Sequence, residues 1–63
     1  MLISRIERFL RETGMPAARL GRLVMADPSF VGDLRSGRLP RPVTEQRLDQ
    51  FMTTYRETHA NAD

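Results

Sequence analysis

The sequence of 63 residues contains no cysteine and only one histidine, His59. Without cysteine the chain can form neither a disulfide nor a zinc–thiolate site, so its fold must be held together by packed apolar side chains, as suits a reducing compartment. His59 could be a metal ligand, but no second histidine or cysteine can converge with it, and we expect it to be solvated. We therefore expect no metal, no cofactor, no small-molecule ligand and no enzymatic activity, because no base, nucleophile and orienting group come together in the sequence.

Long apolar runs are also absent. No stretch approaches the roughly 20 apolar residues needed to cross a bilayer, and the N-terminal hydrophobic residues are mixed with arginine and glutamate, unlike a signal-peptide core. We therefore expect a cytoplasmic protein without membrane contact. A chain this short forms at most one domain and buries only about 60% of the surface that its unfolded form exposes, which predicts marginal stability.

Lysine is missing as well, so all ten basic residues are arginine. They are offset by eight acidic residues to a net charge of +2. Residues 15–42 hold five arginines and two aspartates (+3), whereas the remainder holds five arginines and six acidic residues (−1). The arginines could contact phosphates, whose oxygens match the guanidinium fork, or could simply reflect a GC-rich genome.

Four segments carry apolar residues at helical spacing, and none alternates like a strand. The spacing predicts helices near residues 4–13, 16–24, 28–36 and 45–57 and hence an all-α fold, a compact four-helix domain over residues 1–57. The polar residues 58–63 should form a frayed tail.

The first two predicted helices have recognisable ends. Ser4 followed by Glu7 has the spacing of a capping box, and Gly14 is a natural stop. Pro16 suits the first position of the second helix. The apolar face of that helix comprises Ala17, Leu20, Leu23 and Val24.

The third and fourth helices are delimited by caps and prolines. Asp27 before Pro28 is the clearest signal in the chain, because the aspartate can accept a first-turn amide hydrogen and proline needs no donor there. The third helix should end at Gly37, and two prolines should keep the loop 38–42 out of helical geometry. Thr44 can cap the fourth helix, whose apolar stripe is Leu48, Phe51, Met52 and Tyr55. Of these, Met52 and Tyr55 could be core residues or a subunit contact.

The link between the second and third helices is very short. Two short helices joined by Met25 to Asp27 must cross steeply, as in a helix-turn-helix. Gly21 should face the crossing point, where the missing side chain lets the backbones approach.

The third helix has two different faces. Its apolar residues, Phe30, Val31 and Leu34, should face the core. The opposite face is small and polar and could enter a major groove, although it could also be an ordinary solvated face. It consists of Ser29, Gly32, Asp33 and Ser36.

Four charged residues bear on this hypothesis. Arg38 and Arg41, in a loop stiffened by prolines, are placed to contact phosphates. Asp33 would be repelled by phosphates unless it accepts a hydrogen bond from a cytosine amino group; alternatively it is angled off the groove or pairs with a nearby arginine. Arg35 could pair with a glutamate of the first helix or touch DNA. Four acidic residues that alternate with arginine along exposed faces should form weak surface pairs: Glu7, Glu12, Asp49 and Glu57.

The segment Ala17–Pro42 resembles the lambda-repressor-like (Cro/repressor, or XRE) family. The matching positions, with the spacing of two helices and a turn, are Leu20, Gly21, Val24, Asp27, Val31, Leu34 and Gly37. With the loop and the fourth helix, the resemblance covers roughly two thirds of the chain.

The resemblance implies roles for individual positions. Ala17 stands where the family usually has a phosphate-contacting glutamine, so only its backbone amide could make that contact. The family's base-reading positions are occupied by Pro28, Ser29, Gly32 and Asp33, to which the third helix's outward Ser36 is added, and its phosphate-contacting loop by Arg38 and Arg41. Met25 replaces the usual turn glycine, so it should either be left-handed or change the turn. We expect the family's usual fifth helix, which often helps dimerisation, to be lacking.

The sequence therefore predicts a regulator of transcription that binds duplex DNA sequence-specifically in the cytoplasm, associated with the nucleoid. A homodimer could bind an inverted repeat with half-sites about 34 Å apart. The alternative is a helical module that binds another protein, such as an antirepressor, an antitoxin-like factor or a polymerase-associated adaptor, which the modest net charge favours.

Overall fold

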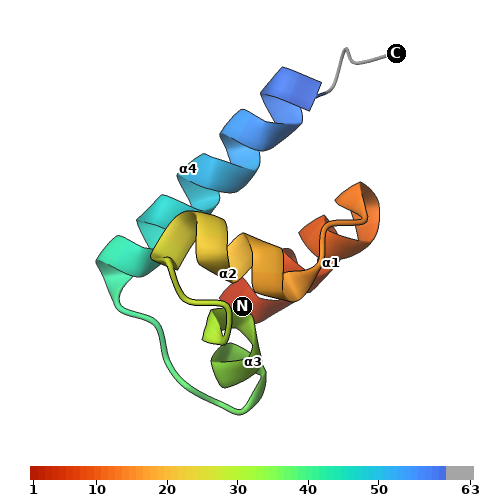
Figure 1. Cartoon of the computed structure of the whole chain (residues 1–63). Coiled ribbons are helices and arrows are strands. Elements are labelled where there is room, and N and C mark those ends of the chain that lie inside the picture. Colours follow the sequence, from red (N-terminus) through yellow and green to blue (C-terminus); the bar gives the residue numbers. More distant parts are fainter. Residues whose placement is uncertain (60–63) are drawn as a thin grey trace.

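The computed structural model describes residues 1–59, which form four helices and no strand. The helices are α1 (Leu2–Thr13), α2 (Ala17–Met25), α3 (Phe30–Arg35) and α4 (Pro42–His59). The prediction of an all-α domain of four helices is thus confirmed. The short α3 lies below α2, and α4 is the longest element (Figure 1).

The core draws on every helix. Five side chains are almost fully buried: Ile6, Phe9, Leu20, Val31 and Leu48. At the C-terminal end of α4, the ring of Phe9 meets two aromatic rings edge-on, Phe51 at 6.3 Å and Tyr55 at 5.4 Å between centroids. This cluster joins α1 to α4. Met52 is buried and Tyr55 is partly buried, so both belong to the core, the first of the two roles considered for them.

The N-terminus of α1 differs from the prediction. The helix begins at Leu2 and its N-cap is Met1, without a side-chain hydrogen bond, so Ser4 lies inside the helix and forms no capping box with Glu7. The reason is packing: the earlier start turns Leu2 into the core, where its exposed fraction is 8%. The predicted end is correct, because Gly14 caps the helix in the left-handed conformation, with φ of 72°.

Two details of α2 also differ. Pro16 is the N-cap rather than the first helical residue, because its ψ of 144° is extended; its carbonyl accepts hydrogen bonds from the amides of Arg19 and Leu20. Leu23 is 55% exposed, not in the core. The packed face of α2 is centred on Leu20 and Gly21, and Leu23 lies beyond the edge of that face away from Gly21.

Helix α4 begins three residues before the predicted start. Pro42 is its first residue rather than part of the loop, which proline tolerates because the missing N–H would have no helical partner there. The amide of Glu45 donates to the carbonyl of Arg41 (3.0 Å), so Thr44 is not the cap and is instead buried within the helix.

The end of α4 takes in part of the predicted tail. Thr58 and His59 are helical, and the His59 ring stacks on Tyr55 with 3.8 Å between centroids. Its Nδ1 also lies 2.9 Å from the Tyr55 carbonyl oxygen. His59 is exposed, as expected, and also makes these two local contacts with Tyr55. The rest of the expected tail, residues 60–63, lies outside the described residues. None of the four helices has the combination of length and apolar character needed to cross a membrane.

Candidate nucleic-acid interface

The turn between α2 and α3 is built around one left-handed residue. That residue is Ala26, with φ of 54° and ψ of 31°, whereas Met25 remains helical; the left-handed position expected at Met25 lies one residue later. The amide of Ala26 donates to the Arg22 carbonyl (3.0 Å) and that of Asp27 to the Gly21 carbonyl (3.2 Å). Helix α2 therefore continues through Met25, one residue beyond the predicted end at position 24. Its C-cap is a left-handed alanine, a conformation with a steric cost.

Gly21 lies where α2 meets the start of α3. A Cβ atom at this position would collide with the backbone carbonyl oxygen of Asp27 and would lie 3.2 Å from the Cβ of Phe30. The close approach expected at Gly21 is therefore present. It fixes the N-terminal end of α3 against the middle of α2.

Asp27 organises the entry into α3. Its Oδ1 accepts a hydrogen bond from the amide of Ser29 (3.0 Å), and its carbonyl accepts one from the amide of Phe30 (3.1 Å). Asp27 thus accepts an amide hydrogen as predicted, but it does so in the turn before the helix; the N-cap of α3 is Ser29, without a side-chain hydrogen bond. The Asp27 contact closes a tight three-residue turn that includes Pro28, so the regular helix begins only at Phe30, two residues later than predicted.

Helix α3 is correspondingly short, with six residues. It ends at Arg35, one residue before the predicted end at position 36. The chain then reverses at Gly37, which is left-handed with φ of 104°, and the amide of Gly37 donates to the Leu34 carbonyl (3.1 Å). The predicted stop at Gly37 is therefore correct.

The two faces of α3 are arranged as expected. Phe30, Val31 and Leu34 are buried, and the candidate base-reading positions are on the surface. Pro28, Ser29, Gly32 and Ser36 are exposed and Asp33 is half-buried. The Ser36 hydroxyl donates to the Gly32 carbonyl (3.1 Å), so its proton is already used within the helix. A Cβ at Gly32 would meet nothing within 4 Å, so this position is open to solvent.

Asp33 has a partner within the chain. Its Oδ2 accepts a hydrogen bond from Nη1 of Arg38 at 3.2 Å, and its backbone carbonyl accepts one from the amide of Arg38 at 3.1 Å. Of the interpretations considered for Asp33, the pairing with a nearby arginine is the one that the structure contains. The sequence feature that indicates this pair is the spacing of five residues between Asp33 and Arg38 across the end of the helix. This spacing brings Arg38 back beside the last turn of α3.

The two loop arginines have different surroundings. Arg38 is tied to Asp33, whereas Arg41 is exposed and forms no ion pair with any other residue in the range 1–59. Both nevertheless line one surface hollow together with Asp27 and Phe30. The loop therefore folds back beside the start of α3, after which the chain passes into α4 (Figure 1).

Ala17 occupies the first position of α2. Its amide forms no hydrogen bond with the other described residues, as is usual for the first amides of a helix, and its side chain packs partly against the core. This amide is at the opposite end of α2 from the turn that leads to α3. It remains a candidate phosphate contact by position alone.

Half of the arginines are paired with carboxylates. Arg35 donates two hydrogen bonds to Glu7, from Nε at 2.8 Å and from Nη2 at 2.7 Å, which confirms the pairing with a first-helix glutamate. These bonds lower the pKa of Glu7 and raise that of Arg35. The arginines that form no ion pair among residues 1–59 are Arg11, Arg19, Arg22, Arg41 and Arg47.

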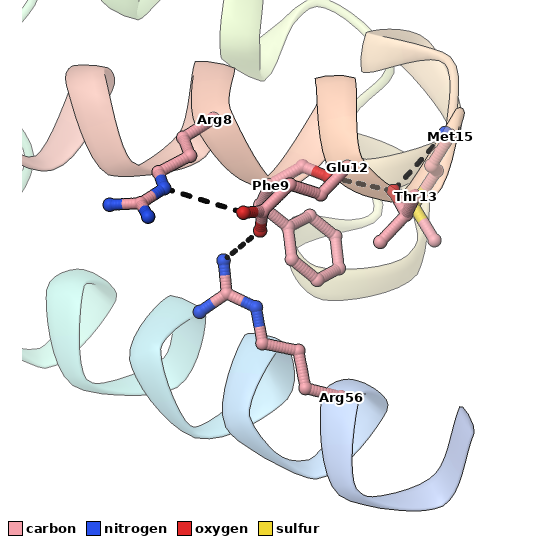
Figure 2. A network of polar contacts seen from close by, with 6 residues as sticks. All are labelled: Arg8, Phe9, Glu12, Thr13, Met15 and Arg56. Atoms are coloured by element: carbon pink, nitrogen blue, oxygen red, sulfur yellow. Dashed lines mark hydrogen bonds and ion pairs between the residues drawn. The ribbon is translucent and has the colours of Figure 1, made fainter. Parts of the chain in front are cut away.

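The other pairs connect α1 with α4. Figure 2 shows Glu12 between two arginines, with Nε of Arg8 at 3.4 Å and Nη2 of Arg56 at 2.9 Å. The guanidinium carbon of Arg56 also lies 5.5 Å from the centroid of the Phe9 ring. Together with Arg5 and Asp49, paired at 2.7 Å, these contacts form the expected surface pairs.

Glu57 forms no ion pair within residues 1–59, unlike the other three acidic residues for which pairs were expected. In the same residues, no three histidine, aspartate or glutamate side chains gather as metal ligands.

No protein-family model, curated protein or solved structure matches this chain. The likeness to the lambda-repressor-like family thus rests on the sequence positions alone.

Proposed function

We propose that the protein binds duplex DNA through α2 and α3, which act as a helix-turn-helix with α3 in the major groove. The observation that carries this proposal is the position of the loop arginines, because Arg38 and Arg41 line one hollow with the start of α3. A helix face of small residues, with Arg38 bound to Asp33 and Arg41 following in the loop, suits a groove flanked by phosphates.

The distribution of unpaired charge supports the same surface. Of the arginines without an ion pair among residues 1–59, three lie between positions 15 and 42: Arg19, Arg22 and Arg41. The two acidic residues of that segment are both engaged within the chain, Asp27 with the Ser29 amide and Asp33 with Arg38. The segment 15–42, with five arginines and two aspartates (+3), is therefore more positive than the whole chain (+2), which favours contact with phosphates.

In the proposed complex, five residues of α3 and its two flanking turns face the base edges. They are Pro28, Ser29, Gly32, Asp33 and Ser36. Arg41 contacts phosphate, and the amide of Ala17 contacts a second phosphate at the other end of α2. Because the reading face is small, one copy has little selectivity, and we propose that two copies bind an inverted repeat. We further propose that the protein regulates transcription on the nucleoid.

A titration monitored by NMR tests the proposal. Amide shifts of the ¹⁵N-labelled protein are followed while a duplex of random sequence is added at low salt. We expect the largest changes at residues 27–41 and at Ala17, and small changes around the pairs of Arg5 and Arg56, which lie between α1 and α4. Changes confined to the α1–α4 side, or no changes, would contradict the proposal.

A second candidate function has one observation in its favour. Three large apolar side chains are strongly exposed, Met1 (92%), Leu39 (85%) and Val43 (60%). Met1 and Leu39 line one surface hollow, and contiguous exposed apolar groups are typical of surfaces that bind another protein. If the protein is such an interaction module, the duplex leaves the spectrum unchanged at every salt concentration.

A further inference from the structure

We infer that Arg38 reads a guanine in the major groove and that Asp33 orients its guanidinium for this contact. This inference rests on the proposed function, and it gives Arg38 a role different from the phosphate contact expected from its place in the loop. It concerns the base pair that lies under the last turn of α3.

Arg38 is fixed at both ends of the residue. Its amide donates to the Asp33 carbonyl at 3.1 Å, and its Nη1 donates to Oδ2 of the same residue at 3.2 Å. An arginine anchored only by its backbone could direct its flexible side chain to many phosphates. Here the second contact holds the guanidinium beside α3, on the side of the helix that carries the half-buried Asp33.

The contact with Asp33 leaves enough donors for a base. A guanidinium has five N–H groups, and the structure uses one nitrogen, Nη1, for the carboxylate. Nη2 and Nε make no hydrogen bond with the rest of residues 1–59, and the side chain is 61% exposed. Two free nitrogens on one edge of the guanidinium match the O6 and N7 acceptors of guanine, the commonest specific arginine contact in the major groove.

The pair also accounts for the acidic residue on the reading face. An isolated carboxylate would be repelled by the phosphates that flank the groove. In the pair with Arg38, the guanidinium offsets the negative charge of Asp33, and the carboxylate orients the guanidinium. The small exposed residues of this face, Ser29, Gly32 and Ser36, are too short to reach guanine acceptors at a distance. The longer Arg35 is held by Glu7, so Arg38 supplies the long side chain for this face.

Arg41 provides the contrast within the same loop. It is exposed and has no carboxylate partner among residues 1–59. No residue in this range orients its guanidinium. A phosphate contact does not need an oriented guanidinium, because it carries no sequence information. The two arginines should therefore differ in kind: loss of Arg38 changes which sequence is preferred, and loss of Arg41 weakens binding to every sequence.

The experiment begins with duplexes selected from a random pool by the wild-type protein at low salt. In the selected duplex each guanine is replaced in turn by 7-deazaguanine, which keeps Watson–Crick pairing and removes the N7 acceptor. We expect one guanine at which this replacement weakens wild-type binding, and full loss of the contact should cost about five- to 100-fold. Binding of Arg38→Ala should be insensitive to the same replacement.

Three further variants complete the test. Asp33→Ala should reduce the effect of that guanine several-fold while leaving Arg38 in place, and its binding to unrelated duplexes should become tighter because a negative charge is lost. Asp49→Asn removes a carboxylate from the Arg5 pair, far from α3 in the sequence, and should leave the preference for the guanine unchanged. Arg41→Ala should weaken binding to all duplexes equally. Circular dichroism verifies that each variant is folded.

The outcomes separate this inference from the proposed function. If no duplex binds even at low salt, both are wrong. If duplexes bind but no guanine loses its effect in Arg38→Ala, or if Asp33→Ala leaves the guanine effect intact, DNA binding stands and the role of this pair is refuted. Tighter binding of Asp33→Ala to every sequence, with no change in preference, would show that Asp33 only withholds Arg38 from phosphate.

Discussion

The carboxylate of Glu7 on α1 accepts two hydrogen bonds from the guanidinium of Arg35 on α3, at 2.8 Å and 2.7 Å. The two residues are 28 positions apart in the sequence, so this paired contact ties the short α3 to the first helix. A bidentate arginine–carboxylate pair fixes orientation better than a single contact. It orients the outer face of α3 away from α1.

This pair makes stability depend on pH. The hydrogen bonds of Arg35 hold the pKa of Glu7 below its ordinary value of 4.5. A group with a lowered pKa stabilises the fold above its ordinary pKa, and this stabilisation is lost as the pH falls through the lowered value. Between neutral pH and about pH 2.5, we expect the Tm of the wild type to fall more than that of Glu7→Gln, as measured by circular dichroism.

Glu57→Gln is the matched control, because Glu57 has no ion-pair partner within residues 1–59. Its Tm should fall with pH as the wild type's does. An equal fall in Glu7→Gln and in the wild type would show that the Glu7–Arg35 pair contributes nothing to acid sensitivity.

Gly21 and Gly32 should respond in opposite ways to alanine. At Gly21 the new Cβ would collide with the Asp27 carbonyl, so Gly21→Ala should destabilise the protein by about 1–3 kcal/mol. At Gly32 the Cβ meets nothing within 4 Å, and Gly32→Ala should stabilise by up to about 1 kcal/mol through helix propensity. Chemical denaturation measures both, and equal effects of the same sign would refute the close approach of α2 to the turn.

Ala26 should be improved by glycine. Its left-handed conformation, with φ of 54°, is one that glycine adopts without steric cost, so Ala26→Gly should stabilise by about 1 kcal/mol. Ala18→Gly, at an exposed position in the first turn of α2, should instead destabilise by up to about 1 kcal/mol. If Ala26→Gly destabilises as much as Ala18→Gly, the turn is not left-handed at this residue.

The sequence was sufficient to predict the number and the order of the helices, because the apolar spacing and the stops at Gly14 and Gly37 are local signals. Helix starts were predicted less well. Ser4 and Thr44 are residue types that often cap helices, but neither is a cap here. Helix α1 begins earlier, at Leu2, whose side chain is buried in the core, and α4 begins earlier, at Pro42. These boundaries depend on packing between helices that a local pattern does not contain.

Exposure and pairing in the candidate site were partly predictable. The buried stripe of α3 follows from its period, and the pairing of Arg35 with a first-helix glutamate was one of two alternatives. The partner of Asp33 required the geometry of the loop, since Arg38 returns to α3 only after the reversal at Gly37. Leu23 was misplaced because its position is at the margin of the helical stripe, where only the neighbouring helices decide burial.

The salt dependence of binding to a random duplex tests the central claim most directly. Between about 50 and 200 mM salt, log K should fall linearly with log salt, and Arg41→Ala should reduce the slope by about 0.9, the contribution of one phosphate contact. Arg47→Ala, an exposed arginine of α4 without an ion pair in residues 1–59, should leave the slope unchanged. No binding at the lowest salt, or a slope that changes with Arg47 and not with Arg41, would contradict DNA binding through α3 and its loop.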